Sequence, residues 1–229
     1  MKRREQRYPH KPDESQGLKI KRLIKAKTAT QAQLLDALDD TALVIATGPA
    51  GTGKTFLAVY AALKALVDGR VDKVVLTRPV VEAGEQLGFL PGDLEEKLHP
   101  YLIPLMDAVN DLVGPTMAKK LREDGIIEIA PLAFMRGRTF NNCFLVADEM
   151  QNATISQMKL LVTRMGENAS FSLNGDPNQC DLPFKDENGI VWMAEKLKGV
   201  DSRVAVLEFR ASEIVRSEMV KMLMKHIGD

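Results

Sequence analysis

The sequence contains few cysteines and histidines. Its 229 residues include two cysteines and three histidines. Cys143 and Cys180 lie far apart and match no paired spacing of metal ligands. His10, His99 and His226 are scattered and form no ligand pattern either. These absences argue against a disulfide framework or a metal site built from these residues, and they favour a reducing, cytoplasmic compartment.

Long hydrophobic runs are also absent. No stretch approaches the roughly 18 to 20 apolar residues that a membrane-spanning helix needs. The basic N-terminus, residues 1–7, is followed by no apolar stretch, so we expect no secretory signal. Hydrophobic residues make up 45% of the chain and charged residues 27%, which is typical of a globular protein. The length fits one α/β domain with a short arm.

The formal net charge of zero conceals an uneven distribution. Residues 1–27 contain ten Lys or Arg and three Asp or Glu, a net charge of +7, which leaves −7 for residues 28–229. We therefore divide the chain into a flexible basic arm, 1–27, and a folded domain, 28–229. A basic arm favours contacts with the phosphates of RNA or DNA. A solvated tail that only keeps the protein soluble explains the same charge equally well.

Short apolar runs alternate with helical patterns along the folded part. Apolar runs bounded by turn residues predict buried strands, and apolar residues at helical spacing predict helices between them. The expected strands are 41–47, 73–77, 126–129, 143–147, 169–173 and 204–208, and the clearest expected helices are 31–38, 56–67 and 156–164. This alternation predicts a three-layer α/β fold with a mostly parallel sheet covered on both faces.

The turn after the first expected strand carries the strongest motif. It fits G-x-x-x-x-G-K-[ST], with a strand before it and a helix after it. Its residues are Gly48, Pro49, Ala50, Gly51, Thr52, Gly53, Lys54 and Thr55. Glycines let several backbone N–H groups point at one phosphate, while Lys54 reaches the β and γ phosphates and Thr55 ligates Mg²⁺. The motif predicts an ATP and Mg²⁺ site; the alternative is a Gly-rich turn without a ligand.

Two later strand ends carry the other candidate groups. Asp148 and Glu149 directly follow the strand at 143–147. Asp148 is suited to hold Mg²⁺ and Glu149 to polarise the attacking water, although an acidic strand end is common on its own. Gln179, in a Gly-Asp-x-x-Gln sequence after the next strand, can sense the γ-phosphate, although Asp-Pro-Asn is also ordinary turn chemistry. A Glu directly after the Asp favours hydrolysis over transfer to a small molecule.

The order of these motifs resembles the first RecA-like domain of superfamily 1 helicases, and more closely the PhoH family of phosphate-starvation-inducible ATPases. The resemblance rests on the P-loop, Thr77-Arg78-Pro79, Asp148-Glu149-Met150-Gln151 and Gly175-Asp176-Pro177-Asn178-Gln179. Further support comes from the segments 77–93 and 129–139, Asp181-Leu182-Pro183 and Val215-Arg216. The match runs from about Lys27 to Arg216, nearly the whole predicted domain.

The resemblance implies a RecA-like fold, ATP hydrolysis, a link to RNA metabolism and ring-shaped homo-oligomers. It also implies that Gln31 reads the adenine edge; the alternative is an exposed helix residue. Arg78 stands where helicases contact single-stranded nucleic acid, but it could equally pair with Glu82 or Glu85.

Helicases of this superfamily complete their ATP site with an arginine from a second RecA-like domain, for which 229 residues leave no room. An arginine finger contributes about 10³ to 10⁵ in rate. We therefore expect the arginine to come from a neighbouring copy in a ring, with a hexamer favoured. Arg136, Arg138 and Arg216 are the candidates. They could instead form surface salt bridges, or Arg136 and Arg138 could grip RNA phosphate.

The sequence thus predicts a Mg²⁺-dependent ATPase that acts on or is stimulated by single-stranded RNA (or DNA), with helicase activity as a further option. Two other functions fit a P-loop. A small-molecule phosphotransferase would need a second substrate pocket and a lid. A non-catalytic nucleotide-dependent switch or scaffold would bind ATP tightly without turnover.

Overall fold

A computed structural model describes residues 17–79, 94–184 and 187–215, together with Met219, Met222 and His226; of residues 94–101 it describes only the backbone. Six parallel strands form its central sheet in the order β3-β2-β4-β5-β1-β6. The strands are β1 Leu43–Thr47, β2 Lys73–Thr77, β3 Ile127–Ile129, β4 Cys143–Ala147, β5 Ser170–Gly175 and β6 Val204–Glu208. Every residue of β1 and β4 is buried, as expected for parallel strands covered on both faces. The predicted fold class is confirmed, and all described strands are parallel.

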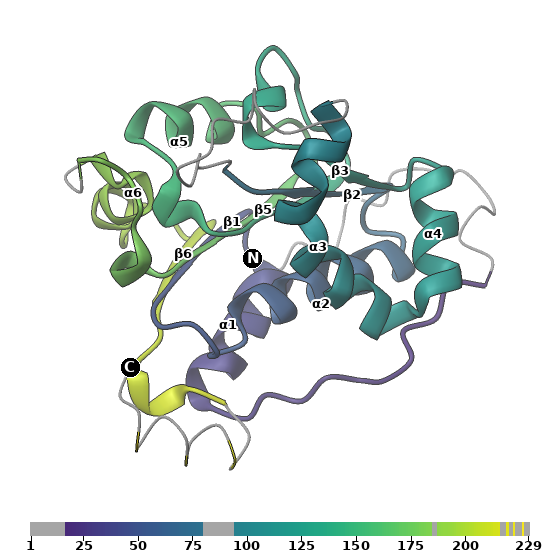
Figure 1. Ribbon diagram of the computed structural model, residues 1–229, viewed down its shortest axis with the longest axis horizontal. Coiled ribbons are helices and arrows are strands. Elements are labelled where there is room, and N and C mark those ends of the chain that lie inside the picture. The colour runs from purple at the N-terminus through teal and green to yellow at the C-terminus, as the bar shows by residue number, and fades with distance from the viewer. Residues whose placement is uncertain are drawn as a thin grey trace.

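Helices cover both faces of the sheet and complete three layers (Figure 1). One face carries α1 Ala29–Asp40, α2 Lys54–Val67, α3 Leu94–Val113 and α4 Pro115–Glu123. The other carries α5 Ile155–Val162 and α6 Gly189–Leu197. Neighbouring residues of one strand face opposite layers: Val44 packs toward α1 and α2, whereas Ile45 packs toward α5 and α6. No described helix is both long enough and apolar enough to cross a bilayer.

Helix α4 was not predicted. It has nine residues, and only Ala118 and Leu121 on it are buried, so its sequence is mostly polar and its apolar pattern is too short to recognise. Four short 3₁₀ turns follow strands or loops: η2 Leu132–Met135, η3 Met150–Asn152, η4 Pro177–Gln179 and η6 Ala211–Glu213.

The described part of the predicted basic arm is packed against the domain. Leu18 is buried, the Lys21 N–H donates to the carbonyl of Leu112 at 2.8 Å, and Arg22 pairs with Asp111 at 2.6 Å. The boundary expected at residue 27 therefore falls inside packed chain. The sequence favoured a flexible arm because five basic residues lie between positions 19 and 27, directly after the single buried Leu18.

The strand order places the carboxyl ends of β1, β5 and β4 side by side at one edge of the sheet. Backbone hydrogen bonds continue past these ends: the Gly48 N–H donates to the Gly175 carbonyl at 3.1 Å, and the Asp148 N–H donates to the Thr77 carbonyl at 3.0 Å. The P-loop and the two later motifs therefore meet at this edge. A site at the carboxyl edge is the usual arrangement in open parallel sheets.

Candidate nucleotide site

The P-loop takes a path that favours glycine at three positions. Gly48 has φ 129°, Gly51 has φ 80° and Gly53 has φ 87°, all in the region that L side chains rarely adopt. A Cβ at Gly48 would lie 2.4 Å from the carbonyl oxygen of Phe209, so this glycine also lets the segment after β6 pack directly on the loop. Gly53 is the N-cap of α2, and it brings the free N–H groups of that helix to the loop's mouth.

Lys54 begins α2, and its ammonium group is buried inside the loop. It donates to the carbonyl oxygens of Gly48 at 2.6 Å and Pro49 at 2.8 Å, and to the Thr52 hydroxyl at 3.3 Å. Burial lowers the pKa of Lys54, which neighbouring carboxylates partly offset. A cation held only by neutral oxygens here is well placed to exchange them for an anionic phosphate.

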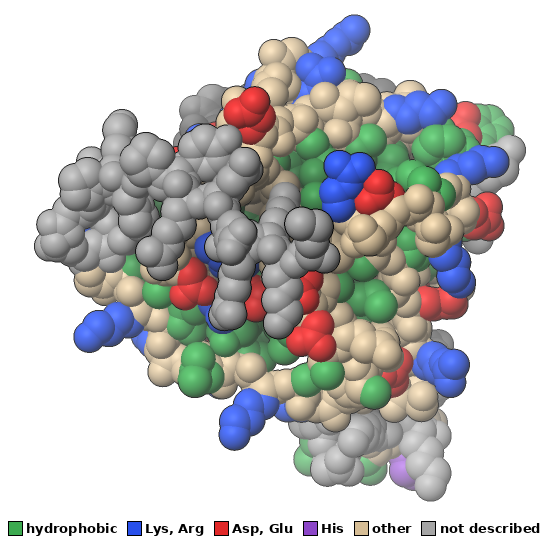
Figure 2. Space-filling view, turned by 180° about the vertical axis from the view of Figure 1, so that it is seen from behind, with side chains coloured by type: hydrophobic (Ala, Val, Ile, Leu, Met, Phe, Trp, Pro, Cys, Tyr) green, Lys and Arg blue, Asp and Glu red, His purple; other side chains and the backbone are tan. Residues whose placement is uncertain are grey.

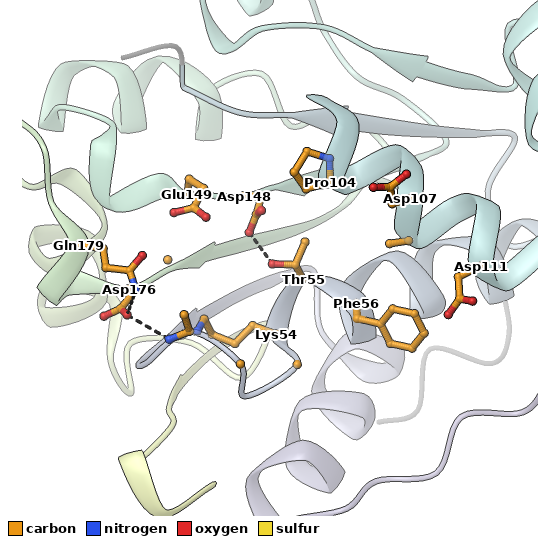
Figure 3. A pocket seen from close by; sticks show the side chains of 15 residues that line it. Lys54, Thr55, Phe56, Pro104, Asp107, Asp111, Asp148, Glu149, Asp176 and Gln179 are labelled. Atoms are coloured by element: carbon orange, nitrogen blue, oxygen red, sulfur yellow. Dashed lines mark hydrogen bonds between the residues drawn. The ribbon is translucent and has the colours of Figure 1, made fainter. Parts of the chain in front are cut away.

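Thr55 and Asp148 place two hard oxygen ligands together. The Thr55 hydroxyl donates to the Asp148 carboxylate at 2.5 Å (Figure 3). Asp148 is 7% exposed, and burial raises the pKa of its carboxyl group, which the hydrogen bond from Thr55 opposes. Mg²⁺ prefers one or two carboxylates or hydroxyls plus phosphate oxygens and retained waters. The donor set therefore fits Mg²⁺ bound together with a nucleotide. Consistent with that, the described residues contain no group of three or more His, Cys, Asp or Glu that could hold a metal alone.

Glu149 is held by partners on both carboxylate oxygens. Arg78, at the end of β2, pairs with one oxygen at 2.7 Å, and the Gln151 amide donates to the other at 2.5 Å. The backbone of Glu149 has φ 55°, a left-handed conformation that costs a non-glycine residue of order 1 kcal/mol or more. Strain of this kind persists where the surroundings fix a side chain in place, so the direction of Glu149 is closely controlled. Of the two contacts expected for Arg78, the acidic partner found is Glu149; Glu82 and Glu85 lie outside the described residues.

Asp176 joins the P-loop to the Gly-Asp-x-x-Gln motif. Its carboxylate accepts hydrogen bonds from the Ala50 N–H at 3.0 Å and from the Gln179 side-chain amide at 3.0 Å. Gln179 itself is exposed and lines the cavity described below. The carboxylate of Asp176 therefore connects the Gln179 side chain to the backbone of the P-loop.

Gln151 belongs to the motif Asp148-Glu149-Met150-Gln151, but the sequence alone assigned it no role of its own. Its side chain is fully buried and uses both ends: the amide donates to Glu149 and to the Gln179 carbonyl at 3.3 Å, and the amide oxygen accepts from the Asp176 N–H at 3.0 Å. The neighbouring Gly175 makes room for it, since a Cβ there would lie 2.8 Å from the Gln151 amide oxygen. The sequence signal was its place two residues after Glu149, but burial of a glutamine cannot be read from spacing.

These side chains line one cavity of about 560 Å³, which falls within the usual size range of small-ligand pockets. Figure 3 shows Glu149, Asp176 and Gln179 at one end, Lys54 and Thr55 in the middle, and Phe56 and Asp111 at the other end. The structure thus brings together the predicted Lys54, Thr55, Asp148, Glu149 and Gln179. The cavity lining consists of Ala50, Gly51, Gly53, Lys54, Thr55, Phe56, Pro104, Asp107, Ala108, Asp111, Asp148, Glu149, Gly175, Asp176 and Gln179.

Gln31 lies beneath the P-loop. It is 5% exposed, so the alternative of an exposed helix residue is wrong. Its amide donates to the Thr52 carbonyl at 2.9 Å, and its amide oxygen accepts from the Lys27 N–H at 2.7 Å. The amide thus ties the backbone of the loop, at Thr52, to the segment that precedes α1, at Lys27.

Two of the three candidate arginines, Arg136 and Arg138, are described by the structure, and neither lines the cavity of its own chain. Arg138 forms a two-bond ion pair with Glu128 and lies 4.6 Å from the ring centre of Phe140. Arg136 is exposed, and Arg216 lies outside the described residues.

The fold and this edge of the sheet define a P-loop protein of the RecA-like α/β class. The chain belongs to the PhoH family, because the model of PhoH-like proteins matches residues 23–228. It is 46% identical over 202 residues to the PhoH-like protein of Bacillus subtilis, which covers 88% of this chain and 63% of the relative. It is 43% identical over 198 residues to Protein PhoH of Escherichia coli K12, which covers 86% of this chain and 56% of the relative.

Solved structures support the fold. The large terminase from a thermophilic bacteriophage matches 86% of this chain and 49% of its own with a TM-score of 0.51 and 14% identity. At that identity the likeness concerns the fold. The chain spans less than two thirds of the length of the relatives named above.

Proposed function

We propose that this chain binds ATP with Mg²⁺ in the P-loop cavity and hydrolyses the bond to the γ-phosphate. The observation that carries the proposal is the hydrogen bond between Thr55 and Asp148, which joins the start of α2 to the acidic end of β4. Lys54 lies on one side of that pair, and Glu149 follows Asp148 in the same cavity. A cationic phosphate site, a hard-oxygen metal site and a carboxylate base are the parts that hydrolysis of a nucleoside triphosphate needs.

The P-loop residues, Gly48 to Thr55, bind and orient the phosphates. Backbone N–H groups of the loop and the first turn of α2 donate to phosphate oxygens, and Lys54 exchanges its carbonyl partners for the β and γ phosphates. Gln31 and Asp176 hold the loop's backbone from two sides. This support keeps the loop in its binding shape and lowers the conformational cost of binding.

Thr55, directly, and Asp148, through the water shell of the ion, would hold Mg²⁺, which would supply neutralisation of charge on the phosphate oxygens. Glu149 accepts a proton from the attacking water as the water oxygen bonds to the γ-phosphorus and the bond to the β–γ bridging oxygen breaks. ADP and phosphate are the products. Arg78 and Gln151 fix the direction of the Glu149 carboxylate. Gln179, at the same end of the cavity, senses the γ-phosphate.

Two substitutions test the proposal. Lys54→Ala should weaken ATP binding and abolish turnover, while Glu149→Gln should keep binding and lower kcat by about 10²-fold or more, as loss of a general base does. Lys119→Ala and Glu123→Gln are matched controls, since both side chains are largely exposed on α4. Unchanged turnover in Lys54→Ala would contradict the proposal. Tight binding with negligible wild-type turnover would favour a nucleotide-dependent switch or scaffold instead.

We further propose that the ATPase acts on or is stimulated by single-stranded RNA (or DNA). The support is the net charge of +7 over residues 1–27. The described surface seen in Figure 2 offers no comparable feature, since its basic and acidic side chains are interspersed. On this proposal, counterion release by the basic segment supplies the attraction.

The nucleic-acid proposal predicts a salt-sensitive stimulation. Replacing Lys2, Arg3, Arg4 and Arg7 by Gln should reduce the slope of log affinity for single-stranded RNA against log salt by about 3, at roughly 0.7 per phosphate contact. Parallel titrations with DNA oligonucleotides identify the preferred strand. If the slope is unchanged, these basic residues do not contact nucleic acid, and their charge serves only to keep the protein soluble.

We also propose that copies of the chain share ATP sites in a ring, with a hexamer favoured. Arg136 and Arg138, the two candidates that the structure describes, do not line the cavity of their own chain, which supports supply by a neighbour. Arg136 is exposed and available for such a contact, whereas Arg138 would first have to leave Glu128. Mass photometry with ATP and Mg²⁺ tests the assembly; monomers with brisk hydrolysis would contradict it.

A further inference from the structure

The cavity continues beyond the phosphate and metal groups. Its far end lies between the first turn of α2 and one face of α3 (Figure 3). Phe56 forms one wall, directly after the proposed metal ligand Thr55. The α3 wall consists of Pro104, Asp107, Ala108 and Asp111. The functions assigned above make no use of this end.

The two ends of the cavity offer a ligand different groups. The P-loop end presents Lys54, backbone N–H donors and the proposed metal ligands, whereas the α3 end presents the carboxylate of Asp107 and, one helical turn further on, that of Asp111, which is paired with Arg22. An ionised carboxylate only accepts hydrogen bonds. Asp107 therefore favours a neutral group that carries hydrogen-bond donors over a phosphate. A ligand with phosphates at the P-loop end and hydroxyl groups at the α3 end fits both sets of groups.

An aromatic surface lies beside these carboxylates. Phe56 is half-buried, and the guanidinium carbon of Arg22 lies 5.9 Å from the centre of its ring. Arg22 is held there by the ion pair with Asp111, and its side chain is 59% exposed. A phenyl ring and a displaceable guanidinium plane are both groups on which a flat heteroaromatic ring stacks well. Gln31, by contrast, uses both ends of its amide on the protein backbone.

We propose that the α3 end of the cavity is the nucleoside subsite of the site described above. The base stacks on Phe56 beside Arg22, and Asp107 accepts a hydrogen bond from a ribose hydroxyl. Asp111 is a positioning residue that holds Arg22. This inference rests on the proposed function, because it needs a nucleoside triphosphate whose phosphates lie in the P-loop.

Binding of two ligands to the whole chain with Mg²⁺ tests the stacking contact. Inorganic tripolyphosphate carries the phosphates without a nucleoside, so it reports the P-loop alone. Phe56→Leu keeps an apolar side chain of similar size and should weaken ATP about 3- to 10-fold, the worth of an aromatic stacking contact. Its affinity for tripolyphosphate should stay within about twofold, and Phe56→Tyr should restore ATP binding. Phe134→Leu, at an exposed phenylalanine outside the cavity, is the matched control.

The ribose contact is tested with 2′,3′-dideoxy-ATP. Wild-type protein should prefer ATP over this analogue, and Asp107→Asn should reduce that preference by about threefold or more, as loss of a charge-assisted hydrogen bond does. Asp36→Asn, at an exposed aspartate of α1 outside the cavity, should leave the preference unchanged.

The outcomes separate the two proposals. If Phe56→Leu weakens the binding of ATP and of tripolyphosphate equally, the proposed nucleoside subsite is wrong, while the proposed P-loop function stands. Equal affinities of wild-type protein for ATP and tripolyphosphate would overturn the subsite as well. If wild-type protein binds neither ligand, both proposals fail.

Discussion

Asp148 carries a cost that the protein pays for its proposed metal site. Its carboxylate is 7% exposed and receives one hydrogen bond from a neutral hydroxyl. Burial of an ionised carboxylate costs several kcal/mol, and burial is the largest cause of the raised pKa of this group. Asp148→Asn removes that cost while its amide oxygen can still accept from Thr55. We therefore expect this variant to unfold at a higher temperature than wild type in EDTA at neutral pH.

The size of the effect follows from three contributions. The variant gains part of the several kcal/mol of desolvation. It loses about 1 kcal/mol because a neutral acceptor forms a weaker hydrogen bond, and about as much again from the attraction between Asp148 and Lys54. A net gain of about 1 kcal/mol remains, which raises Tm by about 2–4 °C in a domain of this size.

The pH dependence gives the reasoning a sign that can be checked. The pKa of Asp148 is raised in the folded state, so wild-type stability is lost as pH rises through that folded value. The Tm difference between Asp148→Asn and wild type should be largest at neutral pH and shrink as the pH falls toward 4. Mg²⁺ with a non-hydrolysable ATP analogue should reverse the order, because wild type then gains the ligand's binding energy. A variant less stable than wild type in EDTA at pH 7.5 would refute the desolvation argument.

Three other substitutions probe the loop, the base and the sheet edge. Gly48→Ala should lower the free energy of unfolding by about 2 kcal/mol or more, since its Cβ meets the Phe209 carbonyl oxygen at φ 129°; urea denaturation measures this. Arg78→Gln should lower kcat about tenfold with KM within about twofold, because it releases one oxygen of Glu149, and Arg78→Lys should recover part of the loss; steady-state kinetics would contradict this if KM alone changed. Glu128→Gln should lower the free energy of unfolding by about 1 kcal/mol at pH 7, after solvent screening is allowed for. In the wild type, hydrogen bonding from Arg138 and its other cationic partner lowers the pKa of Glu128 from 4.5 to about 2. The difference in Tm between variant and wild type should therefore fade as the pH drops from 4.5 to 2.

The fold class could be predicted because the apolar pattern within each segment is enough to predict a strand there. The run 143–147 is apolar at every position and 73–77 at its three central positions, which is typical of strands in a sheet covered on both faces. The order of the strands could not be obtained in this way. It is set by pairing between segments far apart in the chain, such as Leu43 with Phe171 and with Val204. Periodicity predicted an α/β fold with a mostly parallel sheet, and the resemblance to a known family narrowed this prediction to a RecA-like fold.

The candidate site was predictable where a motif fixes its own geometry. The P-loop turn, and the acidic pair at a strand end, place their groups whatever the rest of the chain does. Other contacts depend on tertiary packing: the ion pair of Arg78 with Glu149, and the α3 wall that faces Phe56. Neither has a sequence signal, because the partners come from different elements of the fold.

Gln151 shows why such contacts matter for the chemistry. A buried side chain that must donate to Glu149 and accept from the backbone of Asp176 has to be an amide of this length. A glutamate would place a second carboxylate against the proposed base, and an aliphatic residue would leave buried polar groups without partners, each costing about 1–3 kcal/mol. Through this one amide, the strand end that carries the base is tied to the strand end that carries Asp176, which in turn holds the P-loop. The proposed phosphate site and the proposed base are therefore linked by hydrogen bonds within a single copy of the chain.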